Sequence, residues 1–160
     1  CFNLELINKK FYANIWHGLA EEIPSDQLAE YDIICLLDVI EHLDGVKAKN
    51  LLRFLLQSLG KESFLLISTP LWFYPQTHIQ DGDLEEHLIG IPASSMLAML
   101  PIMYKLNHRL LGTFVYNKNS LNYVDFFHPS SCKEFSLEMG MKIAHATGMK
   151  LEPGTLIRTQ

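Results

Sequence analysis

The stretch that decides the fold is 31-YDIICLLDVIEHLDG-45, an apolar run that ends in ionisable residues. Its apolar half and a second run, 63-SFLLIST-69, are continuous and bounded by polar residues, which is the pattern of strands buried on both faces of a parallel sheet. Residues 44–60 between them predict an amphipathic helix, with Asp44 as N-cap and Gly60 as the stop. The expected buried face of this helix comprises Val46, Leu51, Leu52, Leu55, Leu56 and Leu59. Strand, helix and strand joined in this way predict a right-handed βαβ unit, and therefore an α/β fold with an open, mostly parallel sheet and helices on its faces.

Weaker patterns surround this unit. Residues 2–7 and 13–18 each predict a short strand, and 131–148 predict a second amphipathic helix that begins at a capping box. The last segment, 150–159, predicts an edge strand because Pro153 lies in its middle.

The region 71–130 fits the alternation of strands and helices poorly. It contains an apparent hairpin around Asn117 to Asn119. We therefore expect 71–130 to be an insertion that caps the sheet, within a single, partial domain spanning residues 1–160.

Composition narrows the class of protein. The chain has 160 residues, of which 48% are hydrophobic and 19% charged, as expected for a globular domain. Its net charge of -5 provides no basic surface for bulk binding of nucleic acid. Three scattered cysteines, with no metal-binding spacing, favour reduced thiols and a cytoplasmic location.

The apolar segment 88–104 is interrupted by Pro92 and Pro101, so we expect a buried or interfacial segment and no membrane span. The chain starts at Cys1 without a signal peptide, and we expect further residues upstream. A parallel sheet without its first strand would expose backbone and apolar surface. The expected cover is an N-terminal segment or a partner chain, such as a second copy in a homo-oligomer.

Ligands of open parallel sheets bind beyond the carboxyl ends of the strands. Residues 38–42 and 68–70 lie at two such ends, and 18–22 would lie at the end of an earlier strand. The sequence predicts that these three loops converge on one edge.

These residues resemble a known family. The stretch 31-YDIICLLDVIEHL-43, the helix after it and 64-FLLISTP-70 resemble the fourth strand, following helix and fifth strand of class I S-adenosylmethionine-dependent methyltransferases, a Rossmann-like fold. Upstream, 16-WHGLAEEIPSD-26 resembles the loop after the third strand, and Glu5 matches the end of the second. Downstream, 68–88 resembles a bacterial subgroup with a Pro-Gln segment and a Glu-His pair. The resemblance covers residues 1–88 and, more weakly, the predicted helix and strand from 131 on, without the N-terminal glycine-rich loop of the family.

The resemblance implies S-adenosylmethionine as cofactor. Glu5 would accept the ribose hydroxyls, the alternative being a solvated glutamate at a strand end. Leu19 stands where the family commonly has an acidic residue, so backbone groups of that loop would contact adenine. Asp38 would line the methionyl end, or alternatively cap the segment that follows it. The full set of expected cofactor-binding residues is Glu5, Gly18, Leu19, Ala20, Leu37 and Asp38.

Two histidines are candidate catalytic residues. His42 would act as a general base toward an oxygen or nitrogen acceptor, and His87 would face that acceptor. The alternative for each is a packing or helix-start role. Glu41 is expected to orient its loop or to pair with a cation, and no metal-ligand set is predicted.

The sequence thus predicts methyl transfer to a small or medium acceptor that 71–130 helps to enclose. A non-catalytic binding or assembly module is an alternative, favoured by Leu19, the missing glycine-rich loop and the apolar segment 88–111. A weaker alternative is a metal-assisted hydrolase that uses the acidic and histidine-containing segment 78–87, although a solvated acidic loop is the favoured interpretation of that composition.

Overall fold

A computed structural model describes residues 11–73, 86–107 and 110–130. The predicted strands at 2–7 and 150–159 and the predicted helix at 131–148 lie outside these residues.

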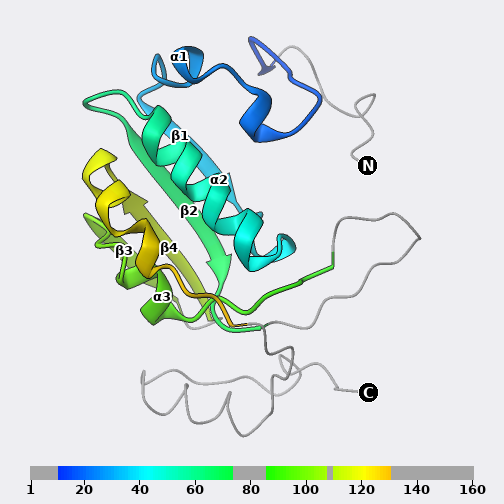
Figure 1. The fold of residues 1–160 in the computed structure, drawn as a ribbon, viewed down its shortest axis with the longest axis vertical. Coiled ribbons are helices and arrows are strands. Elements are labelled where there is room, and N and C mark those ends of the chain that lie inside the picture. Colours follow the sequence, from blue (N-terminus) through cyan, green and yellow to red (C-terminus); the bar gives the residue numbers. More distant parts are fainter. Residues whose placement is uncertain (1–10, 74–85, 108–109, 131–160) are drawn as a thin grey trace, which may run out of the picture.

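The predicted βαβ unit is present. Strand β1 (Ile33–Leu37) is followed by helix α2 (Gly45–Ser58) and by strand β2 (Phe64–Pro70), which pairs with β1 in parallel (Figure 1). The Asp44 carboxylate caps α2 by accepting the N–H groups of Val46 at 3.0 Å and Lys47 at 2.9 Å. The five leucines of the predicted apolar face are buried, but Val46 is 71% exposed because the helical repeat places it on the side of α2 opposite to buried Ala48.

The sheet continues beyond β2 with reversed direction. Strand β4 (Leu111–Tyr116) is antiparallel to β2, and β3 (Met103–Leu106) is antiparallel to β4, which gives the order β1-β2-β4-β3. The α/β class is therefore confirmed, whereas the described sheet is mixed, with one parallel and two antiparallel pairings. The short connection between β3 and β4 accounts for their antiparallel pairing, whereas the antiparallel pairing of β4 with β2 joins residues far apart in the sequence.

Two local predictions are wrong. Residues 13–18 form no strand, and Asn117 to Asn119 form no hairpin turn. Instead the Asn117 side chain accepts the N–H of Asn119 at 3.0 Å and starts the 3-10 helix η5 (Lys118–Phe126). Asparagine serves turns and helix caps through the same side-chain-to-backbone bond, so the sequence pattern was ambiguous. Residues 103–106 and 111–116, within the predicted insertion, are strands of the sheet itself.

The core lies between the sheet and two elements that cover one of its faces. Helices α2 and η5 lie side by side over this face (Figure 1), and Arg53 on α2 donates to Asp125 on η5 at 2.5 Å. Tyr116 is fully buried and donates its hydroxyl proton to the carbonyl of Met96 in helix α3 (Ala93–Leu97) at 2.9 Å.

The predicted buried or interfacial character of 88–104 is confirmed in part, because Met96 and Met99 are inaccessible to solvent while Ile102 and Met103 are exposed. No helix among the described residues is both long and apolar enough to span a membrane.

Candidate functional site

The carboxyl ends of β1 and β2 are joined by Asp38 and Ser68. The Asp38 N–H donates to the Ser68 carbonyl at 3.0 Å, and the Ser68 hydroxyl donates to Asp38 Oδ1 at 3.0 Å. Asp38 has a φ of 51°, a left-handed conformation that aspartate tolerates better than most residues. The chain therefore turns sharply at this edge, where the Asp38 side chain is exposed to solvent. The 3-10 helix that follows is N-capped by Val39, so Asp38 does not take the alternative capping role.

The short 3-10 helix η4 (Ile40–His42) directs the next two polar side chains. Glu41 points into the protein and is only 2% exposed, and its Oε2 accepts the hydroxyl proton of buried Thr69 at 3.1 Å. His42 is half-buried, and its Nδ1 lies 3.2 Å from the carbonyl oxygen of Glu86.

The segment 86–89 is hydrogen-bonded to η4. The Leu88 N–H donates to the Glu41 carbonyl at 2.8 Å and the Ile89 N–H donates to the same oxygen at 3.3 Å. Together with the contact between His42 and Glu86, these bonds fix the segment that carries His87 beside η4. A residue 45 positions further along the chain than His42 thus reaches the same site.

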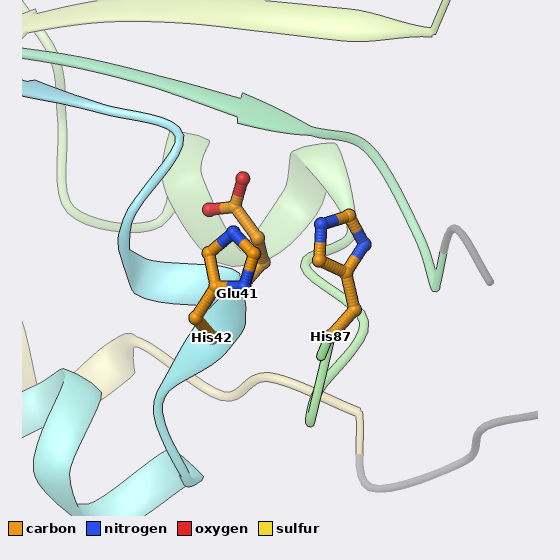
Figure 2. Close-up of side chains that lie close together, drawn as sticks. All are labelled: Glu41, His42 and His87. Carbon is orange, nitrogen blue, oxygen red and sulfur yellow. The ribbon is translucent and has the colours of Figure 1, made fainter. Parts of the chain in front are cut away.

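Glu41, His42 and His87 form one cluster. Their side chains lie close together in Figure 2, with the two imidazole ring centroids 4.6 Å apart at 73° between the ring planes. One potential ligand atom from each of the three residues lies within 4.8 Å of the other two. His87 is 4% exposed, so two of the three side chains are almost fully buried.

The electrostatics of the cluster centre on Glu41. Burial raises the pKa of its carboxyl group to about 7, and the negative charge of Asp38 contributes to the rise, while hydrogen bonds from the backbone and from Thr69 oppose it. No donor among the described residues reaches the buried Oε1. A proton or a cation would satisfy this oxygen, so the cluster can hold a proton or a metal ion.

The structure places the predicted site residues unevenly. Glu5 lies outside the described residues. Leu19 is 68% exposed and precedes the short 3-10 helix η3 (Ala20–Glu22), which packs against α2. No hydrogen bond among the described residues joins Gly18, Leu19 or Ala20 to Asp38, and the convergence of that loop on the edge formed by Asp38 and Ser68 stays a prediction. Leu37 is 54% exposed at the end of β1.

His42 and His87, by contrast, are brought together. The sequence did not predict that Glu41 would share their cluster. One signal was available, an acidic residue next to a histidine just after a buried strand, but the partnership with His87 depends on tertiary contacts. Of the predicted acidic segment 78–87, residues 78–85 lie outside the described residues.

Comparison of the chain with protein-family models, with curated proteins and with solved structures finds no significant match.

Proposed function

We propose that the chain is a class I methyltransferase domain that transfers a methyl group from S-adenosylmethionine to a small or medium acceptor. The observation that carries the proposal is the pairing of Asp38 with Ser68 at the carboxyl edge of two parallel strands, next to two histidines. This edge is where open α/β sheets bind nucleotide ligands.

The proposal includes a sheet that extends beyond β1. In the described part of the chain β1 is an edge strand, and its outward face carries Ile33 and Leu37, which are 56% and 54% exposed. Apolar side chains at a sheet edge favour a further strand or a covering element. We assign that role to parallel strands of a Rossmann-like sheet, or to a second copy of the chain.

The residues at the edge fit a cationic methyl donor. The Asp38 carboxylate is exposed, and its orientation is fixed by the bond from Ser68 and by the backbone bond between the same two residues. A carboxylate held in this way attracts the ammonium group of the methionyl moiety by a charge-assisted hydrogen bond. Leu37 supplies an adjacent apolar wall.

S-adenosylmethionine supplies a methyl group on a positively charged sulfur. In the proposed transfer an acceptor oxygen or nitrogen bonds to the methyl carbon, the carbon–sulfur bond breaks with its electron pair remaining on sulfur, and the acceptor proton leaves to a base. His42 is placed for that role, because with Nδ1 donating to the Glu86 carbonyl its Nε2 keeps a lone pair. His87, with its ring 4.6 Å from that of His42, orients the acceptor. Alignment of the two reactants provides most of the rate enhancement in such a site.

The proposed function implies a cytoplasmic location and a small-molecule partner. Cys35 is exposed and is a free thiol, which suits a reducing cytoplasm. The acceptor is the expected small-molecule partner.

Calorimetric titration with S-adenosylmethionine tests the proposal. We expect binding to the wild-type protein and a loss of at least about tenfold in Asp38→Ala, since a charge-assisted hydrogen bond contributes about 1.5–3 kcal/mol. Asp26→Ala is the matched control, because Asp26 is an exposed aspartate on helix α1 (Ser25–Leu28).

Absence of binding, or equal binding by both variants, would refute the assignment. Binding without formation of S-adenosylhomocysteine across a panel of hydroxyl and amine acceptors would instead support the alternative of a non-catalytic binding module.

A further inference from the structure

We propose that Glu41, His42 and His87 bind one divalent transition-metal ion of the Zn²⁺ type. This inference does not depend on the assignment of a methyl donor, because it is drawn from the ligand atoms and the burial of the cluster alone.

The geometry of the cluster is close to that of a metal site. Metal–nitrogen and metal–oxygen bonds of about 2.0–2.2 Å place ligand atoms about 3–4 Å apart. The three candidate atoms lie within 4.8 Å of one another, so binding requires them to approach by about an ångström, a movement that side-chain rotation provides. Figure 2 shows the three side chains converging from η4 and from the segment carrying His87.

The backbone holds this arrangement in place. The Glu41 carbonyl accepts N–H groups from Leu88 and Ile89, so the two elements that supply the ligands are directly bonded. Such a preformed site reduces the conformational entropy that metal binding must overcome.

The buried carboxylate of Glu41 independently points to a bound cation. Glu41 is 2% exposed and Oε2 is bonded to Thr69, whereas no donor among the described residues reaches Oε1. A buried carboxylate oxygen without a partner is costly, and native proteins retain such groups mainly where a ligand or ion satisfies them. A divalent cation between Glu41 and the two imidazoles would supply the missing positive charge.

The environment of His42 provides further support. Metal-binding histidines usually donate the proton of their other ring nitrogen to a carbonyl or carboxylate, which fixes the tautomer. His42 Nδ1 lies 3.2 Å from the carbonyl oxygen of Glu86, and this contact leaves Nε2 as the metal ligand. The Nε2 lone pair cannot accept a proton while it binds a metal, so the metal-ligand role and the base role of His42 exclude each other.

The ligand types select the metal. Two imidazoles and one carboxylate suit Zn²⁺ and neighbouring transition metals, whereas Mg²⁺ and Ca²⁺ prefer sites built from oxygen alone. Three protein ligands also leave a coordination position for water or for an oxygen of a bound molecule, which distinguishes catalytic from structural zinc sites.

Calorimetric titration of the chelator-treated protein with Zn²⁺ alone tests the proposal. All proteins carry Cys1→Ser, Cys35→Ser and Cys132→Ser, because a free thiol, such as that of exposed Cys35, would bind zinc independently. We expect one equivalent to bind in this background, and an affinity loss on the order of 100-fold or more in Glu41→Gln, His42→Asn and His87→Asn. His128→Asn is the matched control and should bind as the background does, since the His128 side chain is exposed and outside the cluster.

Glu41→Gln keeps the shape of the side chain, so it tests the site even where a histidine variant fails to fold. Absence of a one-equivalent site in the background protein, or its retention in Glu41→Gln, would overturn the proposal. Mg²⁺ binding with equal affinity would overturn the metal assignment. Because no methyl donor is present, a negative result leaves the methyltransferase proposal intact.

Discussion

Glu41→Gln should stabilise the metal-free protein at alkaline pH. The substitution removes a buried negative charge while keeping the length of the side chain and the acceptor for the Thr69 hydroxyl. The rise in the Glu41 pKa from 4.5 to about 7, at about 1.4 kcal/mol for each pKa unit, corresponds to roughly 3 kcal/mol of destabilisation of the folded state above pH 7.

The sign follows from proton linkage. Between 4.5 and about 7 the folded protein retains the Glu41 proton while the unfolded chain has lost it, so the free energy of unfolding falls as pH rises through this window. Glutamine does not titrate. The stability of the variant relative to wild type should therefore increase by about 2–3 kcal/mol from about pH 5 to pH 8. The unpartnered amide of glutamine adds the same offset at both pH values and cancels from this change.

Urea unfolding, followed by circular dichroism in the presence of a chelator, measures the two free energies at each pH. Glu62→Gln is the matched control, because Glu62 is an exposed glutamate in the turn before β2 and should show little pH-dependent difference from wild type. Parallel pH profiles for wild type and Glu41→Gln would refute the account of Glu41 as a buried, unneutralised carboxylate.

Three further predictions concern the fold. Asp44→Ala should lower the urea midpoint more than Asp44→Asn, because asparagine retains the cap. The hydrogen bonds from Lys47 and Val46 lower the pKa of Asp44, so its charge stabilises the fold above pH 3.8 and this contribution is lost as the pH falls below that value. A series of urea unfolding curves at different pH values measures this loss. Leu52→Ala should destabilise by about 2–5 kcal/mol, because Leu52 is inaccessible to solvent on the sheet side of α2; an unchanged midpoint would contradict the packing. Tyr116→Phe should destabilise by about 1–2 kcal/mol in the same assay through loss of the bond to the Met96 carbonyl, and a neutral effect would mean that this bond does not stabilise the fold.

The sequence predicted those features that depend on neighbouring residues. The apolar run of β1, the leucines of α2 and the cap at Asp44 are local patterns, and the structure contains all of them. The prediction that β1 is buried on both faces is wrong for the described sheet, where β1 is an edge strand and only Leu36 of its residues is buried. The direction of β4 could not be predicted in this way, since it depends on pairing with residues more than forty positions earlier in the chain. The asparagines at 117 and 119 misled the prediction because the same side-chain bond serves a hairpin turn and a helix cap.

The candidate site likewise has one part that the sequence predicts and one part that depends on tertiary contacts. Position alone placed Asp38 and Ser68 at the carboxyl edge, because the end of a buried strand can be recognised in sequence. The environment of Glu41 could not be inferred, since its burial requires both η4 and the segment 86–89.

Asp38 and Glu41 are three residues apart, yet the structure gives their carboxyl groups opposite environments. Asp38 turns outward through its left-handed conformation and meets solvent beside Ser68, whereas the single turn of η4 directs Glu41 into the protein, where burial raises its pKa. One edge of the sheet therefore presents an exposed carboxylate suited to a solvated cation and a buried carboxylate suited to a desolvated one. Zn²⁺ bound by Glu41 and the two imidazoles would give this cluster a net positive charge, which repels a cationic methyl donor held by Asp38. The two proposed binding events at this edge should then be negatively coupled, which calorimetric titration with S-adenosylmethionine in the presence and absence of Zn²⁺ would detect as a lower affinity with the metal bound.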